Sequence, residues 1–437
     1  MLVMKFGGTS VQDATSLKQV ASIVKNHLHE QDGLVVVLSA TAGTTDVLLD
    51  IARGAGLGRD VSNELEALDT RHTTILAELA PLATHVALRS ILEDCKVYTR
   101  ALSVLGECTS QSLDHMAAFG EQLSTSILHS ALEAETVRTA YFDVRQIMRT
   151  DDTFCSAIVD MKSTRQLSTQ HLLSRCSTGS VVVTQGFIGA DGNDRTTTLG
   201  RGGSDYTCAI LGAVLGAREI RIWTDVSGVF SADPRVVPDA QPITELSFDE
   251  VREMALYGAK VLHPDTIAPA IDALIPVQVL NTFKPNEPGT RIVSQSATTS
   301  DVHAVSIVRG CSFVRCDSTT AAHLRSLSEL STTIVLETET IETSMFVFHT
   351  PTEASYLALE VAVADSSLPM QRVSLIAVTG PAVSSPRVTS AIISTMSSFE
   401  VHCLSAGATA HTIFMAVDAQ HGNDAVRAIH SIIPRHL

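Results

Sequence analysis

Five consecutive aliphatic residues, Leu34-Val35-Val36-Val37-Leu38, restrict this chain to few fold classes. An amphipathic strand alternates polar and apolar positions, so an unbroken apolar run is typical of a strand buried on both faces. Further strand-like segments, most of them with one polar residue, occur at residues 2–6, 181–183, 220–223 and 276–280, and apolar residues recur at helical spacing over 14–29. Strands that alternate with helices predict a mostly parallel sheet with helices on both faces.

The chain has 437 residues, more than one compact core accommodates, so two or three domains are expected. Residues 60–135 have mostly helical patterns and could form an insertion near a substrate. A segment rich in Pro, Gly, Ser and Thr over 281–300 predicts a linker. Beyond it, two β-α-β-β-α patterns follow one another, each about 60–70 residues long, the size of a small domain. Strands are expected near 302–308, 332–336, 345–348, 373–378, 400–404 and 413–417, and helices near 321–330, 353–363, 387–397 and 423–433.

Composition excludes several function classes. With 31 basic and 47 acidic residues the net charge is −16, which argues against nucleic-acid binding as a main role. No apolar run reaches the roughly 18–20 residues that span a bilayer, and strand-like sequence stands where a signal peptide would begin. The eight cysteines form no CxxC pair, so free thiols and a cytoplasmic protein without membrane contact are expected.

Two glycine-bearing runs indicate recognition of anions. Lys5-Phe6-Gly7-Gly8-Thr9-Ser10 follows a predicted strand, and Arg201-Gly202-Gly203-Ser204-Asp205-Tyr206 precedes a helix of small residues. Glycines let a backbone approach phosphate oxygens, and free N–H groups at a helix N-terminus favour negative charge. The first run lacks the spacing of a Walker loop, and its glycines alone fit a surface turn equally well. Together the two runs predict phosphoryl transfer to a small acid.

Two further segments are ambiguous by themselves. Small hydroxyl residues at 39–46 follow the buried strand, where ligands bind in open α/β sheets, but Thr45 or Asp46 would also suit a helix N-cap. Glu121, in Phe119-Gly120-Glu121, is either a solvent-exposed glutamate at the start of a helix or a carboxylate that binds the ammonium group of a substrate.

Two later segments suggest a nucleotide pocket. In residues 224–235, Asp225 suits a ribose hydroxyl or a purine amino group, Phe230 could form a wall against the base, and Arg235 suits a phosphate. An ordinary Asp/Gly/Pro loop has the same composition. Residues 257–264 add a second lysine, Lys260, which could bind phosphates from the side opposite Lys5. His263 beside it is better explained as structural.

These motifs, in this order, closely resemble the aspartokinases, a branch of the amino-acid kinase superfamily. KFGGTS (5–10), RTTTLGRGGSDYT (195–207), WTDVSGVFSADPR (223–235) and YGAKVLHP (257–264) match signatures of that family. The resemblance implies an α/β/α kinase domain over residues 1–296 and tandem, nested ACT domains of α+β fold over 297–437. It also implies transfer of the ATP γ-phosphoryl group to the side-chain carboxylate of L-aspartate, giving 4-phospho-L-aspartate for lysine, threonine and methionine synthesis.

The resemblance also implies roles for individual positions. Lys5, Asp205 and Lys260 would be catalytic, with Asp205 orienting a lysine. The substrate site would comprise Thr45, Glu121, Phe187, Arg201, Gly202, Gly203 and Ser204. The ATP site would comprise Lys5, Phe6, Gly7, Gly8, Thr224, Asp225, Phe230, Arg235, Lys260 and Val261. On charge grounds Arg201 would pair with a substrate carboxylate and Glu121 with the ammonium group. Mg²⁺ would accompany ATP, and no metal site made by the protein alone is expected.

Three departures from the family pattern qualify this assignment. Phe230 stands where relatives often have tyrosine, and Asp46 replaces a frequent asparagine. The first C-terminal repeat, over 309–326, lacks the expected glycine-containing ligand turn and has Cys311-Ser312-Phe313 in its neighbourhood. Feedback control by lysine or threonine is therefore expected to be weakened or altered, and a homodimer, possibly a tetramer, is expected.

Two alternatives compete with this assignment. Another kinase of the superfamily could act on glutamate or acetylglutamate, but Glu121 and Thr45 suit a free α-amino acid better. An amino-acid sensor with an inactive kinase domain is disfavoured by the intact Lys5, Asp205 and Lys260. A fused homoserine dehydrogenase is not expected, because no further dinucleotide domain fits in 437 residues.

Overall fold

The computed structural model describes residues 1–28, 33–82, 84–176, 179–258, 262, 264–297, 301–326, 333–339, 343–364 and 368–433. Its contacts divide the chain into two compact units, which we describe separately. Met1–Gly228 and Pro264–Ser294 form the N-terminal unit, and Val229–His263 and Gln295–Leu437 form the C-terminal unit. This division differs from the expected boundary at 296 in one segment, because residues 229–263 pack with the C-terminal part of the chain.

The N-terminal unit is built on the predicted, mostly parallel sheet. Its strands lie in the order β3-β4-β2-β1-β7-β9-β10. Their bounds are β1 Leu2–Phe6, β2 Leu34–Leu38, β3 Thr139–Phe142, β4 Val181–Gln185, β7 Glu219–Thr224, β9 Val277–Asn281 and β10 Thr290–Val293. Only β10 runs antiparallel to its neighbour β9. Phe6 pairs with Leu38 on one side and with Trp223 on the other, so the carboxyl ends of the central strands meet at one edge.

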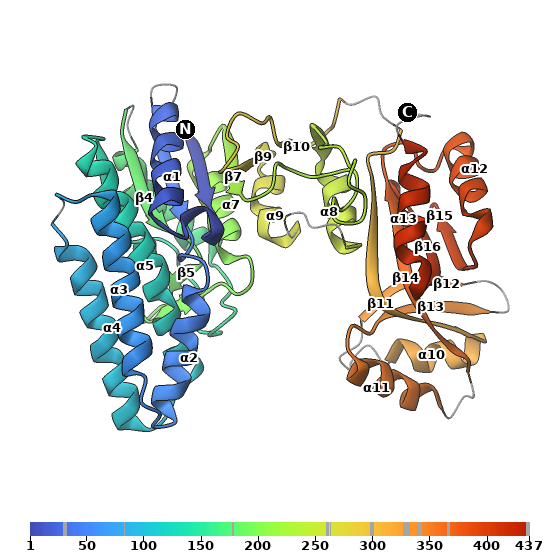
Figure 1. The fold of residues 1–437 in the computed structure, drawn as a ribbon, viewed down its shortest axis with the longest axis horizontal. Helices are drawn as coiled ribbons and strands as arrows, with labels where there is room; N and C mark the ends of the chain where they lie inside the picture. Colours follow the sequence, from blue (N-terminus) through green and yellow to red (C-terminus); the bar gives the residue numbers. More distant parts are fainter. Residues whose placement is uncertain are drawn as a thin grey trace. The chain divides into compact units, whose positions relative to one another are not determined.

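Helices cover both faces of this sheet. The helices of the unit are α1 Ala14–His27, α2 Thr44–Gly56, α3 Ser62–Leu79, α4 Val86–Leu105, α5 Ser110–Ala134, α6 Met161–Leu167, α7 Gly203–Leu215 and α9 Pro264–Asp272. Apolar residues of α1, α3 and α5 share a core with one face of β1, and α7 contacts β1 and β7. Figure 1 shows α3, α4 and α5 running alongside one another, which confirms the helical pattern expected over 60–135. A short hairpin of β5 (Ile188–Ala190) and β6 (Thr196–Thr198) completes the unit.

The C-terminal unit contains one antiparallel sheet that serves both predicted repeats. Its order is β12-β13-β11-β14-β16-β15. The bounds are β11 Ala304–Cys316, β12 Thr333–Glu339, β13 Ser344–His349, β14 Met370–Thr379, β15 Val401–Ala406 and β16 Thr412–Asp418, with α10 Ser318–Ser326, α11 Glu353–Ala364, α12 Pro386–Thr395 and α13 Gly422–His430. The long strands β11 and β14 pair along nearly their whole length across an irregularity between Val308 and Cys311. Beyond Cys311, β11 also pairs with β13, whereas β16 pairs with β14 over the other half, so the two repeats share their central strands.

The segment 229–263 is held in the C-terminal unit by apolar and polar contacts. It contains β8 (Glu245–Ser247) and α8 (Phe248–Leu256). Four of its residues, Ala232, Val236, Val237 and Ala240, belong to the apolar core formed with α12, α13, β14 and β16. The buried Ser231 Oγ lies 2.9 Å from His430 Nε2, which fixes this segment against α13.

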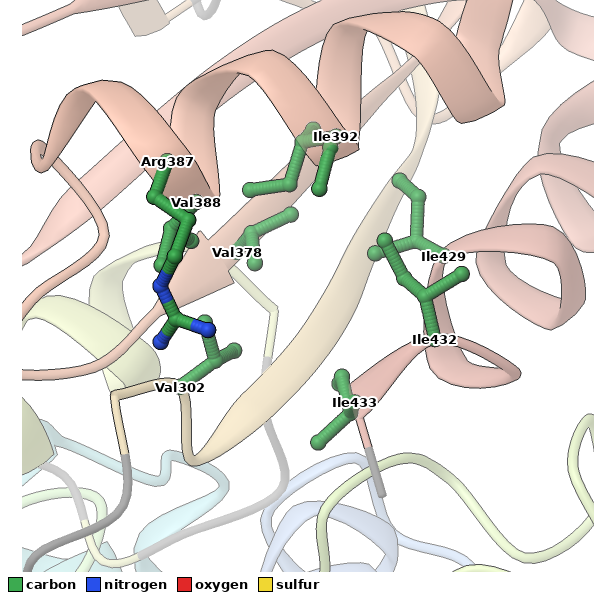
Figure 2. A pocket seen from close by; sticks show the side chains of 9 residues that line it. Val302, Val378, Arg387, Val388, Ile392, Ile429, Ile432 and Ile433 are labelled. Carbon is green, nitrogen blue, oxygen red and sulfur yellow. The ribbon is translucent and has the colours of Figure 1, made fainter. Parts of the chain in front are cut away.

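A small apolar cavity lies in the same core between α12, α13 and β14 (Figure 2). It has a volume of about 100 Å³, and its lining consists of aliphatic side chains and Arg387. The Arg387 guanidinium forms an ion pair with Asp301. Since the lining offers water few partners, such a cavity is expected to stay dry.

No helix among the described residues is long and apolar enough to cross a membrane. All eight cysteines lie within the described ranges and are free thiols, as the sequence predicted.

Candidate active site

A cavity of about 680 Å³ opens in the N-terminal unit and collects most of the predicted catalytic and substrate-binding residues. Those that line it are Lys5, Gly8, Thr45, Glu121, Phe187, Arg201, Gly202, Gly203, Ser204 and Asp205. They come from β1 and the turn after it, the first turn of α2, α5, the loop after β4 and the start of α7. The parallel register explains this meeting, because ligands in open α/β sheets bind beyond the carboxyl ends of strands.

Lys5 and Asp205 form a largely buried ion pair in this cavity. The Lys5 ammonium lies 2.7 Å from Asp205 Oδ1, and the side chains are 11% and 19% exposed. Lys5 lies in β1 and Asp205 in the first turn of α7, so the pair joins the sheet to the helix. A lysine held in this way presents a fixed positive charge to an anionic ligand.

The loop after β1 runs close to neighbouring backbone. The Gly7 N–H donates to the Trp223 carbonyl oxygen over 3.1 Å. A Cβ atom on Gly8 would lie only 3.0 Å from the Ala40 oxygen, so a side chain there would crowd the loop after β2. Phe6, predicted to contact the nucleotide, is fully buried with its ring stacked on Trp223, so this side chain belongs to the core.

The start of α7 supplies the second anion-binding element. Gly202 is the N-cap residue and has a φ of +75°, which glycine adopts without strain. Arg201 precedes it, is exposed, and makes no ion pair with any residue that the structure describes. A free guanidinium beside a helix N-terminus can bind a carboxylate in two-point fashion.

Phe187 forms a constrained wall of the cavity. Its φ of +67° lies in the left-handed region, which is uncommon for a residue with a side chain. The conformation is held from both sides, since the Phe187 N–H donates to Thr207 Oγ1 and its carbonyl accepts from the Leu199 N–H. Backbone strain of this kind is concentrated at functional sites.

Glu121 is the most electrostatically perturbed group of the cavity. It is 3% exposed, and its Oε1 accepts a hydrogen bond of 3.2 Å from the Ala40 N–H. Its Oε2 is buried without a hydrogen-bond partner among the described residues. Burial raises the pKa of the Glu121 carboxyl from 4.5 to about 8, and the Ala40 hydrogen bond offsets only part of that shift. A cation placed against Oε2 would stabilise the charged form.

Two alternatives left open by the sequence are wrong. Glu121 is not a solvated residue at a helix start, because α5 begins at Ser110 and places Glu121 in its buried middle. Neither Thr45 nor Asp46 caps α2, because that helix begins at Thr44 and its N-cap is Gly43, with a φ of +77°. Thr45 and Asp46 instead line the cavity from the first turn of α2.

The residues predicted to bind ATP are divided between the two units. Thr224 ends β7 beside the Phe6–Gly7 turn, and its hydroxyl donates to Asp225 Oδ1 over 3.1 Å. Phe230 and Arg235 belong to the C-terminal unit, where Phe230 packs against the core and Arg235 pairs with Asp233. Lys260, Val261 and His263 lie outside the described residues.

The cavity also contains residues that the sequence motifs did not indicate, including Arg53 and Asp114. The buried Asp114 carboxylate accepts hydrogen bonds from the Cys155 N–H and from the N–H and hydroxyl of Thr198. Its spacing of seven positions from Glu121 places both acids on one face of α5, and this is the signal that could have identified it.

Most of the chain is similar to proteins of a known family. The model of the Amino acid kinase family matches residues 1–281. Lysine-sensitive aspartokinase 3 of Escherichia coli K12 is 38% identical over 327 residues, covering 74% of this chain and 71% of that protein.

Solved structures extend the similarity along the chain. The E. coli aspartokinase III structure with aspartate and ADP has a TM-score of 0.79 at 30% identity, covering 99% of both chains. The structure of that enzyme with lysine and aspartate has a TM-score of 0.80 at 29% identity and the same coverage. The chain therefore belongs to the amino acid kinase family and, within it, to the aspartokinases, as the sequence motifs indicated.

Proposed function

We propose that this protein transfers the γ-phosphoryl group of ATP to the side-chain carboxylate of L-aspartate. The products are 4-phospho-L-aspartate and ADP, which makes the reaction the first step towards lysine, threonine and methionine. The membership of the aspartokinase family supports this proposal, as do the aspartate and ADP bound in the E. coli relative.

The observation that carries the proposal is that one cavity holds both a paired lysine and a buried, half-satisfied carboxylate. Lys5 suits a phosphoryl group, whereas Oε2 of Glu121 suits the ammonium group of an amino acid. Arg201 can take a carboxylate of the same substrate. An acid without a free ammonium group, such as an N-acetylated one, would leave the Glu121 oxygen unsatisfied.

Catalysis then consists of positioning and charge neutralisation. A side-chain carboxylate oxygen of aspartate attacks the γ-phosphorus in line, and the bond from that phosphorus to the β–γ bridging oxygen breaks, leaving ADP. Lys5 offsets the negative charge on the transferring group, and Asp205 holds its ammonium in place. Thr45, Ser204 and Phe187 shape the aspartate site.

The nucleotide would occupy the glycine-bearing turn after β1 and the end of β7. Gly7, Gly8, Thr224 and Asp225 suit it, and Phe230, Arg235, Lys260 and Val261 stay predictions from the family pattern. Within the described ranges, no group of three or more His, Cys, Asp or Glu side chains could hold a metal ion. Mg²⁺ would be held chiefly by the ATP phosphates, as is usual for this ion.

Regulation and assembly complete the proposal. The shared antiparallel sheet of the C-terminal unit suits a tandem, nested ACT pair spanning roughly 297–437, and we propose lysine or threonine as its effector. Lysine is bound in the E. coli relative. Because the first repeat lacks the family's ligand turn, we expect weak or altered control, and a clear lysine or threonine isotherm at millimolar concentration or below would contradict this. A cytoplasmic homodimer, possibly a tetramer, is the expected form.

The test is ATP-dependent ADP release with L-aspartate, and in parallel with L-glutamate and N-acetyl-L-glutamate. Lys5→Met should abolish release, whereas Lys25→Met, which removes an exposed lysine paired with Glu135, should not. Release with aspartate alone supports the proposal. Release only with another acid would show that this acid, and not aspartate, is the substrate. No release with any acid overturns the kinase assignment in favour of an amino-acid sensor.

A further inference from the structure

The loop that follows β2 is supported by a helix that does not itself line the cavity. Residues 39–43 of this loop line the cavity, and α3 packs behind them. His72 of α3 is fully buried. Its Nδ1 lies 2.8 Å from the Leu68 carbonyl oxygen, and its Nε2 lies 3.1 Å from Thr41 Oγ1.

The protons of this group have one consistent arrangement. The Leu68 carbonyl can only accept, so Nδ1 carries a proton. Burial lowers the pKa of His72 to about 4, so at neutral pH the ring is uncharged and Nε2 is an acceptor. The Thr41 hydroxyl must therefore donate to His72. Its oxygen can then accept from the Thr44 hydroxyl, 2.6 Å away at the start of α2.

Arg71 fastens the same loop from its other side. Its guanidinium donates to the carbonyl oxygens of Ala42, over 2.9 Å, and Gln12, over 3.2 Å, and reaches Thr44 Oγ1 at 3.4 Å. Two consecutive residues of α3 thus hold the loop through its hydroxyls and its backbone. Neither is among the residues that line the cavity.

The held loop in turn positions the carboxylate proposed to bind the substrate ammonium. Ala40, one residue before Thr41, donates its N–H to Glu121 Oε1. The Ser124 hydroxyl donates to the Ser39 carbonyl over 2.7 Å, and a Cβ atom on Gly120 would lie 2.8 Å from the Ala40 Cβ. The loop therefore packs closely against α5, and a small shift of the loop would break the hydrogen bond from the Ala40 N–H to Glu121.

We propose that His72 is a positioning residue for the amino-acid substrate. It fixes the Thr41 hydroxyl, and through the loop it keeps the Ala40 N–H on Glu121 Oε1, so that Oε2 stays directed at the cavity. The inference rests on the proposed function for the identity of the substrate. The hydrogen-bonded arrangement around the histidine is independent of it.

The kinetic test separates positioning from stability. His72→Phe keeps a ring but removes both ring nitrogens, and we expect it to raise KM for aspartate about tenfold while kcat and KM for ATP change less than about threefold. His72→Gln, which can return an acceptor to Thr41, should recover most of the lost KM. Ile75→Ala, in the core side of the same helix, should lower the melting temperature without raising KM.

A second variant and a spectroscopic readout keep the inference testable if His72→Phe fails to fold. Thr41→Val removes only the hydroxyl and should raise KM for aspartate in the same way. In the wild type, ¹⁵N NMR should find His72 as the neutral Nδ1–H tautomer at pH 7.

Three results would overturn the inference: an unchanged KM in Thr41→Val, an equal rise of KM in Ile75→Ala, or an Nε2–H tautomer. A wild type without aspartate-dependent turnover would refute the proposed function instead. In that case, the NMR measurement of the tautomer would still test the proposed hydrogen bonds of His72.

Discussion

Replacing Glu121 by glutamine tests the substrate site most directly. The substitution keeps the shape of the side chain and removes its charge. Burial raises the pKa of the Glu121 carboxyl from 4.5 to about 8, a difference that corresponds to roughly 5 kcal/mol at 1.36 kcal/mol per pH unit. In the proposed site, that cost of ionisation would be offset when the ammonium group of aspartate occupies the free side of the carboxylate.

The magnitude for binding follows from this pairing. Removing one partner of a buried charge pair typically costs about 2 kcal/mol or more, so Glu121→Gln should raise KM for aspartate at least about thirtyfold. With a pKa of about 8, the wild-type carboxyl is mostly protonated at pH 7, and the proposed pairing requires it to lose its proton when aspartate binds. The wild-type KM should therefore fall roughly tenfold between pH 7 and pH 9, and that of Glu121→Gln should not.

Calorimetry provides the decisive measurement. Titration of aspartate at pH 7, in two buffers of different ionisation enthalpy, should show release of about 0.9 proton per site from the wild type and none from Glu121→Gln. Glu133→Gln, which changes an exposed glutamate of the same helix, is the matched control and should behave as the wild type. Equal proton release by the wild type and Glu121→Gln, or an unchanged KM in that variant, would refute the reasoning.

The raised pKa of Glu121 also makes the stability of the substrate-free protein depend on pH. Because the pKa of Glu121 is raised in the folded state, the wild type loses stability as pH rises from 4.5 through about 8. Glu121→Gln lacks this loss. Urea unfolding should therefore show the variant gaining on the wild type between pH 5 and pH 8, and a constant difference would argue against a buried ionisable carboxyl.

Three further predictions concern neighbouring groups. Lys5→Met should lower kcat by a factor of about 10³ or more while the protein stays folded, and near-normal turnover would remove Lys5 from the mechanism. Asp205→Asn should lower kcat less, because the lysine remains. His72 has a pKa lowered to about 4, so up to about 3 kcal/mol of stability should be lost as pH falls from 6.5 towards 4, and urea unfolding of His72→Gln at pH 5 and 7 should lack that dependence. Asp114→Ala leaves the N–H groups of Cys155 and Thr198 unpaired and should cost about 1–3 kcal/mol in thermal unfolding; an unchanged melting temperature would contradict the hydrogen bonds described.

The parallel sheet could be predicted because its signal is local and repeated. An apolar run such as Leu34–Leu38 identifies a buried strand, and adjacent parallel strands must end at the same edge. The loops after β1 and β2 then have to lie near one another, which places Lys5 beside the loop after β2. Arg201 and Asp205 could be predicted for another reason, because glycines before a helix of small residues indicate an anion-binding helix N-terminus.

The packing of residues 229–263 could not be predicted in the same way. The Pro/Ser/Thr-rich stretch over 281–300 marks a change of composition, but composition does not say which core an earlier segment will join. That choice depends on complementary apolar faces and on single contacts across large sequence separations, such as Ser231 with His430. The N-cap of α2 could not be predicted either. It is Gly43, which adopts a left-handed conformation, whereas Thr45 and Asp46 in the sequence are more typical N-cap residues.

His72 shows the same limit in the substrate site. In sequence it is one polar residue on an amphipathic helix, and the more common explanation is a satisfied core histidine. The structure agrees with that explanation, because both ring nitrogens have partners, and one partner is Thr41 in the loop that lines the cavity. A pairing of residues 31 positions apart is not encoded by any local spacing.

Glu121 shows why burial can be a better functional signal than a motif. A carboxylate in the middle of a core-facing helix is unfavourable unless a partner satisfies it. The Ala40 N–H donates to Oε1, whereas Oε2 has no hydrogen-bond partner among the residues that the structure describes. The adjacent Gly120 lets the Ala40 loop approach closely, so the helix is shaped to hold this acid rather than to avoid it. Such an arrangement is favourable only when a cation enters the cavity. In the proposed function that cation is the ammonium group of aspartate, whose carboxylate Arg201 would bind in the same cavity.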